Sequence, residues 1–256
     1  MSLNDHFKDS GAVKYGEPPY GHAELSSLKT FAKKLKLDLT KSMELLDQAG
    51  YPVEDSMITY TGLPGPVISD HLSREDAVSH YAEGTTFQIG KIEMVANTGT
   101  YIDAPFHRYS EGIDLSGLEM ASIANLDGIV FRTAQKMRSI DKDIFESDPV
   151  EGRAVLIQTG WDRHWRSDAY FENHPFLTRD AAEYLKASGA ALVGIDSLNI
   201  DDTTDGSRPA HSILLKADIP IVEHMCNFDE LPDRGFRFFA VPTPVKGMGN
   251  FPVRTF

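Results

Sequence analysis

Residues 97–107 read Asn-Thr-Gly-Thr-Tyr-Ile-Asp-Ala-Pro-Phe-His, and the interpretation of the whole chain starts from this stretch. In an extended strand, alternate side chains share one face. Four residues therefore line one face of the predicted strand: Asn97, Gly99, Tyr101 and Asp103. A buried strand face normally carries aliphatic side chains, and burying amide, phenol and carboxylate groups costs free energy unless they bind something. The row predicts a binding site on this strand.

The end of the stretch adds an imidazole to this row. Pro105 limits strand pairing and turns the chain, which brings His107 close to Asp103. A carboxylate beside an imidazole is either a structural hydrogen-bonded pair or part of a catalytic site. The spacing alone leaves both interpretations open.

The sequence on either side predicts a sheet with helices between its strands. The pattern is extended from residue 85 to 103, and five later segments are typical of strands: 128–133, 154–159, 191–196, 219–225 and 236–242. Helices are predicted at 23–36, at 178–186 with Thr178 as the N-cap, and at 211–216. This alternation indicates the α/β class, although the connections are too irregular for a regular doubly wound sheet.

Length and composition describe an ordinary globular protein. The 256 residues favour one domain over 23–256, preceded by an arm at 1–22 that is rich in glycine, proline and charge. A net charge of −13 opposes binding to nucleic acid. The longest apolar runs fall far short of the roughly 20 residues that a membrane span needs, and no basic segment leads into an apolar one at the start of the sequence. We therefore expect a cytoplasmic protein that has no membrane partner.

Residues 97–107 resemble the motif His-x-Gly-Thr-His-x-Asp-x-Pro-x-His of the cyclase family, which includes bacterial kynurenine formamidases and isatin hydrolases. Further stretches are similar to landmarks of that family in the same order: Thr159-Gly-Trp161-Asp-Arg-His-Trp165, His174-Pro-Phe, Gly194-Ile-Asp196-Ser197, Ala210-His211-Ser-Ile-Leu-Leu, Ile221-Val-Glu223 and Pro252-Val-Arg254. The resemblance implies a mixed β-barrel-like core of the swivelling β/β/α type with flanking helices. It also implies a homo-oligomer, such as a dimer, and metal-dependent hydrolysis of amides, lactams or lactones of small metabolites, aromatic ones included.

Residue by residue, the resemblance implies a site with one departure from the family. Three positions match metal ligands of the family: Asp103, His211 and Glu223. His107 matches its catalytic histidine. Asn97 and Tyr101 stand where the motif has histidines. An amide oxygen is a weak ligand, and a phenol with a pKa of about 10 is a poor one. We therefore predict at most one divalent ion per subunit, Zn²⁺ or Mn²⁺.

Three hypotheses for function follow. In the first, the metal lowers the pKa of bound water and polarises a carbonyl group, His107 transfers protons, and Asn97 and Tyr101 donate hydrogen bonds to the oxyanion. In the second, a metal-free isomerase, dehydratase or lactone-opening enzyme uses Asp103 to orient His107 as a general base. In the third, the chain is a non-catalytic protein that binds a small molecule on the same fold.

Several of these residues also have simpler interpretations. Taken singly, His211 could cap a carbonyl group at a helix start, and Glu223 could be a solvent-facing strand residue. Trp161 is a candidate wall for a flat aromatic substrate, although tryptophan is most often a core residue. Arg254 could bind a substrate carboxylate or tie the last strand to an acid.

Overall fold

The computed structural model describes residues 63, 65–133 and 137–256. The chain divides into two compact units, of which the first includes residues 65–94 and the second residues 95–133 and 137–256. The predicted arm at 1–22 and the predicted helix at 23–36 lie outside the described residues. The predicted division into arm and domain therefore stays a prediction.

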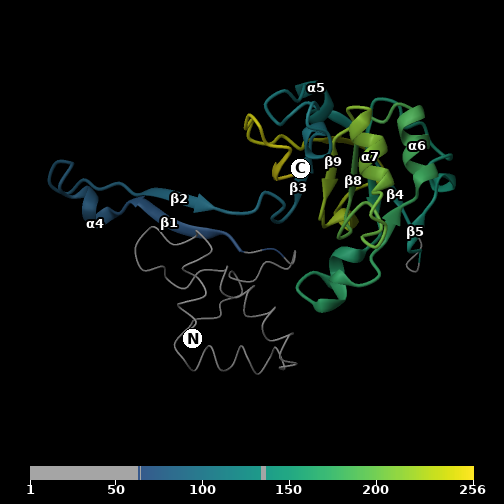
Figure 1. Ribbon diagram of the computed structural model, residues 1–256. Coiled ribbons are helices and arrows are strands. Elements are labelled where there is room, and N and C mark those ends of the chain that lie inside the picture. The colour runs from purple at the N-terminus through teal and green to yellow at the C-terminus, as the bar shows by residue number, and fades with distance from the viewer. Residues whose placement is uncertain (1–62, 64, 134–136) are drawn as a thin grey trace. The chain divides into compact units, whose positions relative to one another are not determined.

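The described part of the first unit is a two-stranded antiparallel sheet (Figure 1). It comprises β1 (Val67–Leu72), α4 (Arg74–Ala77) and β2 (Ile89–Glu93). Ser73 begins α4, because its hydroxyl accepts a hydrogen bond from the backbone nitrogen of Asp76. This unit contains none of the predicted site residues.

The second unit is built on a seven-stranded sheet of order β10-β4-β6-β8-β9-β3-β11. Its strands are β3 (Tyr101–Asp103), β4 (Leu126–Arg132), β6 (Arg153–Gln158), β8 (Leu192–Ile195), β9 (Ile221–Glu223), β10 (Arg234–Phe238) and β11 (Asn250–Pro252). The four central strands from β4 to β9 run parallel, whereas β10, β3 and β11 pair antiparallel with their neighbours. A parallel strand covered on both faces needs apolar residues throughout, and β6 supplies them.

Two apolar clusters cover the two faces of this sheet. Val155 and Ile157 of β6 belong to one cluster, and Ala154 and Leu156 belong to the other, as the two-residue period of a strand requires. Two helices, α6 (Arg179–Ala187) and α7 (Pro209–Lys216), contribute buried residues to the first cluster and lie side by side (Figure 1). This packing holds the start of α7 against the sheet.

Short elements complete the unit. They are η2 (Pro105–His107), α5 (Met120–Ile123), β5 (Ser139–Ile140), η3 (Lys142–Ile144), η4 (Trp161–His164), η5 (Asp168–Phe171), β7 (Phe176–Leu177) and η6 (Phe228–Glu230). β5 and β7 form a separate two-stranded parallel sheet. Among the described residues, no helix is both long and apolar enough to cross a membrane.

The predicted α/β class with a mixed sheet and flanking helices is confirmed. All five strands predicted after residue 103 are present, and Thr178 caps α6 by accepting a hydrogen bond from the backbone nitrogen of Ala181. In the part of the chain that the structure describes, the order of strands ends at β10 on one side and at β11 on the other, so no closed barrel is described there.

The continuous extended segment predicted over residues 85–103 is wrong in its middle. β2 ends at Glu93 and β3 begins at Tyr101, with a turn between them. Gly99 has a φ of 69° in this turn, a left-handed conformation that a strand does not contain. Only Tyr101 and Asp103 therefore share a strand face. Asn97 lies in the segment before β3 and is not part of this strand.

Candidate metal and active site

Two neighbouring strands and one helix start bring the predicted residues together. β3 pairs with β9, and Tyr101 lies opposite Glu223 in this register. The first turn of α7 carries His211. Asp103 and Glu223 are fully buried, and His211 is 6% exposed. Buried carboxylates need partners to offset the cost of losing water, so their surroundings decide what this cluster does.

His211 faces both carboxylates without forming a hydrogen bond of normal length to either. Its Nε2 atom lies 3.6 Å from Oδ2 of Asp103 and 3.6 Å from Oε1 of Glu223. Oδ2 of Asp103 is the one buried side-chain oxygen or nitrogen atom in the described residues that has no hydrogen-bond partner. An unpartnered buried carboxylate oxygen of this kind is suited to bind a cation.

These distances fit a shared divalent ion. Ligand atoms about 2.1 Å from a tetrahedral ion lie about 3.4 Å from one another, close to the separations around His211. Within the described residues, Asp103, His107 and His211 also offer ligand atoms that all lie within 4.8 Å of one another. The imidazole and carboxylate donors of this cluster suit Zn²⁺ or Mn²⁺.

Asp201, which the sequence analysis did not identify, orients His211. Its Oδ2 atom lies 2.6 Å from Nδ1 of His211 and accepts a hydrogen bond of 3.0 Å from the His211 backbone nitrogen. Its Oδ1 atom accepts a hydrogen bond of 2.6 Å from the backbone nitrogen of Ala210. A carboxylate beside Nδ1 fixes the ring so that Nε2 faces Asp103 and Glu223, the arrangement of a carboxylate–histidine–metal triad, in which Nε2 would give its lone pair to the metal.

The buried carboxylates of the cluster shift the pKa values of its members. Burial alone would lower the pKa of His211, but Glu223, Asp103 and Asp201 raise it to about 10. Burial also raises the pKa of the Glu223 carboxyl to about 7, although the charge of His211 opposes this. The raised pKa of His211 reflects the nearby carboxylates, whereas that of Glu223 reflects mainly its burial. A divalent cation bound among these carboxylates would offset their charge.

Tyr101 occupies the position of a motif histidine and contacts Glu223. Its hydroxyl donates a hydrogen bond to Oε2 of Glu223. Burial, followed by the charges of Glu223 and Asp103, raises the pKa of Tyr101 well above its usual range, so the phenol keeps its proton. The backbone nitrogen of Ile200 donates to Oε1 of Glu223 at 2.6 Å, and Asn199 donates to Oε2 at 3.3 Å. Glu223 is therefore held from several sides.

His107 and Asn97 meet at the amide of Asn250, a residue that the sequence analysis also missed. Nδ2 of Asn250 lies 2.9 Å from Nδ1 of His107 and donates to Oδ1 of Asn97 at 3.0 Å. Asn97 also lowers the pKa of Tyr101 slightly, against the larger effects that raise it. His107 is the most accessible member of the cluster, because 35% of its side chain is exposed, whereas the Asp103 side chain is fully buried.

Trp161 and Arg254 are not joined directly to this cluster. Nε1 of Trp161 donates to the carbonyl oxygen of Tyr170 at 3.0 Å, and the Tyr170 hydroxyl lies 2.8 Å from Nδ1 of His224. Arg254 is exposed, and no hydrogen bond or ion pair among the described residues connects it to the cluster. Their predicted role in substrate binding stays a prediction.

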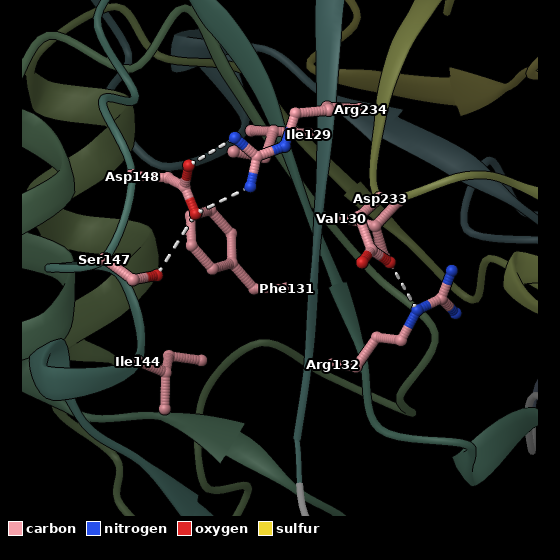
Figure 2. Close-up of a pocket in the computed structure, with 9 residues that line it drawn as sticks. All are labelled: Ile129, Val130, Phe131, Arg132, Ile144, Ser147, Asp148, Asp233 and Arg234. Carbon is pink, nitrogen blue, oxygen red and sulfur yellow. Dashed lines mark hydrogen bonds and ion pairs between the residues drawn. The ribbon is translucent and has the colours of Figure 1, made fainter.

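A cavity of about 240 Å³ lies elsewhere in the second unit, and none of its lining residues belongs to the cluster (Figure 2). Its charged side chains are already paired. Arg234 contacts Asp148 at 2.8 Å, and Arg132 contacts Asp233 at 2.8 Å. We therefore assign the chemistry to the buried cluster.

The fold and the cluster define an α/β enzyme with a buried imidazole–carboxylate site. Residues 37–202 match the model of the family described as "Putative cyclase". The kynurenine formamidase of Bacillus cereus is 30% identical over 173 residues, which cover 67% of this chain and 80% of that protein. The kynurenine formamidase of Geobacillus thermodenitrificans is 31% identical, over 68% of this chain and 81% of that protein.

Solved structures agree at the level of fold. A predicted metal-dependent hydrolase from Bacillus stearothermophilus has a TM-score of 0.59 at 26% identity and covers 80% of this chain and 93% of its own. An isatin hydrolase bound to a product analogue has a TM-score of 0.62 at 22% identity, over 75% of this chain and 81% of its own. The chain belongs to the cyclase family, and it is a hydrolase of the cyclase type.

Proposed function

We propose that this protein is a metal-dependent hydrolase that cleaves an amide C–N bond of a small aromatic metabolite, with lactam and lactone bonds as related substrates. The observation that carries the proposal is the orphaned Oδ2 atom of Asp103, which lies beside Nε2 of His211 in a fully buried acidic cluster. The kynurenine formamidases among its relatives support the amide bond and the aromatic substrate.

Asp103, His211 and Glu223 are the proposed ligands of one divalent ion, Zn²⁺ or Mn²⁺. When bound, such an ion supplies Lewis acidity, which activates water and polarises a carbonyl group. The protein holds the ligands in place: Asp201 orients His211, and three hydrogen bonds orient Glu223. One ion per subunit follows from Asn97 and Tyr101, which provide an amide and a protonated phenol where two imidazoles would otherwise stand.

His107 is the proposed group that meets the substrate. Its ring is the most exposed of the cluster and lies 5.9 Å from the ring of His211, centroid to centroid. His107 is therefore the residue of the cluster that a substrate could contact most easily from solvent. Two tasks are open to an imidazole there, proton transfer and hydrogen-bond donation.

The metal-free alternative has less support. It requires Asp103 to orient His107, but Nδ1 of His107 lies 3.7 Å from Oδ1 of Asp103, beyond hydrogen-bond distance. The amide of Asn250 contacts both groups instead. Asp103 is therefore better placed as a ligand than as the partner of a general base.

Hydrolysis assays with metal analysis test the proposal. Protein purified without added metal is assayed with an aryl formamide, with isatin and with a simple lactone, before and after chelation and after addition of Zn²⁺ or Mn²⁺. We expect the formamide to react fastest and chelation to abolish the reaction. His211→Gln should lower kcat/KM by at least about a hundredfold. His71→Gln, at an exposed residue of the first unit, is the matched control. Equal rates with and without metal would refute the proposal.

The assembly and the compartment belong to the same proposal. We expect a cytoplasmic homo-oligomer, such as a dimer, because the family resemblance implies an oligomer. Light scattering at micromolar concentration should give a multiple of the 28.4 kDa subunit mass. A mass equal to one subunit would exclude the oligomer.

A further inference from the structure

The amide nitrogen of Asn250 lies close to two oxygen atoms and one ring nitrogen of the site. Asn250 begins β11 and lies opposite Asp103 in the register with β3. Its Nδ2 atom is 2.9 Å from Nδ1 of His107, 3.0 Å from Oδ1 of Asn97 and 3.3 Å from Oδ1 of Asp103. The residue is only 8% exposed, so these protein groups are its main partners.

The carboxylate of Asp103 determines which way this amide faces. If the amide of Asn250 were turned over, its oxygen would lie against a carboxylate oxygen that has no hydrogen to share. In the orientation of the structure, the nitrogen faces Asp103 and donates to it. The neighbouring acceptors therefore assign the Asn250 nitrogen, not its oxygen, to the position beside His107.

The assignment of Asn250 settles the tautomer of His107. An amide nitrogen donates hydrogen bonds but has no lone pair that can accept one. A proton on Nδ1 of His107 would therefore point at another donor at 2.9 Å. Nδ1 must carry the lone pair, and a neutral imidazole then carries its hydrogen on Nε2.

The backbone holds this contact in place. The carbonyl oxygen of Gly249 accepts a hydrogen bond of 2.7 Å from the backbone nitrogen of Ala104. A Cβ atom at residue 249 would lie 2.4 Å from the backbone nitrogen of His107, so only glycine permits this approach. The glycine thus allows β11 to bring the Asn250 amide against the His107 ring.

We propose that Asn250 is a positioning residue that holds His107 as the neutral tautomer with its hydrogen on Nε2. His107 then presents a hydrogen-bond donor to the substrate carbonyl, and it acts as an electrophile instead of a general base. In this tautomer Nε2 carries a proton and the lone pair of Nδ1 accepts a hydrogen bond from Asn250. Neither nitrogen is then free to ligate a metal, which separates His107 from the ligand set of Asp103, His211 and Glu223. The substrate part of this inference rests on the proposed hydrolase function, whereas the tautomer does not.

Nitrogen-15 NMR measures the tautomer directly. Protein labelled at its nine histidines and loaded with Zn²⁺ gives long-range ¹H–¹⁵N correlations, in which protonated and unprotonated ring nitrogens have well-separated shifts. His107→Gln identifies the signals of His107 by their loss. We expect Nε2 to be protonated and Nδ1 to be unprotonated. A proton on Nδ1, or an Nε2 atom that is unprotonated in the Zn²⁺-loaded protein, would overturn the proposal.

Two variants test the role of Asn250 itself. Asn250→Leu keeps the approximate volume but removes the donor, and the His107 signals should then show a mixture of tautomers. Asn250→Asp places an acceptor beside Nδ1 and should move the proton onto Nδ1. Signals of His107 that stay unchanged in both folded variants would show that Asn250 does not set the tautomer.

Kinetics separate positioning from a structural role. In Asn250→Leu, assayed at saturating Zn²⁺, we expect kcat for the aryl formamide to fall by about tenfold to a hundredfold with KM unchanged. An unchanged kcat would overturn the catalytic part of the proposal. If no substrate is hydrolysed even by the unmodified protein, the proposed function fails, but the NMR result still decides the tautomer.

Discussion

Asp201→Asn tests whether the metal cluster depends on a carboxylate that is not itself a proposed ligand. In the folded protein, Asp201 joins the start of α7 to the imidazole of His211 through three contacts. The substitution keeps the shape of the side chain and removes its charge. Its effect therefore reports on hydrogen bonding and charge, with little change in packing.

The expected magnitude follows from the two oxygen atoms. One accepts a hydrogen bond from Ala210, and the other faces the backbone nitrogen and Nδ1 of His211. Whichever way the new amide turns, its NH₂ group meets at least one N–H donor. A lost hydrogen bond to a charged group costs about 1.5–3 kcal/mol, and a buried unsatisfied donor costs about 1–3 kcal/mol. We expect the free energy of unfolding to fall by about 2–4 kcal/mol.

The metal affinity should fall as well, because His211 loses the group that fixes its tautomer and ring orientation. Loss of such a partner weakens metal binding by about tenfold to a hundredfold. Urea unfolding of the chelated protein measures stability, and competition with a Zn²⁺ indicator measures affinity. Asp202→Asn is the matched control, because Asp202 accepts from Thr204 and pairs with Arg138 instead. If Asp201→Asn bound Zn²⁺ as tightly as the unmodified protein, Asp201 would not orient a metal ligand.

Three further predictions concern Gly249, His174 and the pair Asn97 and Tyr101. Gly249→Ala should lower the free energy of unfolding by about 1–3 kcal/mol, because its Cβ atom would overlap the backbone of His107, and an unchanged urea midpoint would contradict this. Burial lowers the pKa of His174 below its ordinary 6.5, so below that pH the unfolded chain takes up a proton that the folded chain does not. Stability should therefore fall from about pH 7 to pH 5, and His174→Gln should flatten this slope in urea unfolding. Asn97→His together with Tyr101→His should raise bound metal by up to one ion per subunit, which elemental analysis measures.

Much of the fold could be predicted because its local patterns agree with its packing. The apolar run of β6 has the composition of a strand that is buried on both faces, and Thr178 caps α6 as the sequence indicates. Tyr101 and Asp103 share a strand face, as the two-residue period requires. The turn around Gly99 was missed because a glycine within an extended pattern fits a strand, a bulge or a turn equally well.

The supporting residues of the site could not be predicted because their roles arise from distant pairing. Asp201 stands in a stretch with several acids and turn formers, and nothing local distinguishes it from Asp202. The position of Asp201 could have indicated its role, because it lies ten residues before His211, in the loop that leads into the predicted helix. Asn250 gave no such signal, since only the pairing of β11 with β3 brings it to His107.

The two departures from the family motif have different structural consequences, and single substitutions separate them. Tyr101→His alone removes the hydrogen bond to Glu223 and supplies one imidazole, whereas Asn97→His alone removes an acceptor from the amide of Asn250. A second metal position built from two imidazoles needs both changes, so neither single variant should add an ion. Tyr101→His should nevertheless weaken binding at the first position, because Glu223 loses one of the groups that orient it. If Tyr101→His alone raised the bound metal by a full ion per subunit, the second position would not require an imidazole at residue 97, and the proposed reason for a single ion would be wrong.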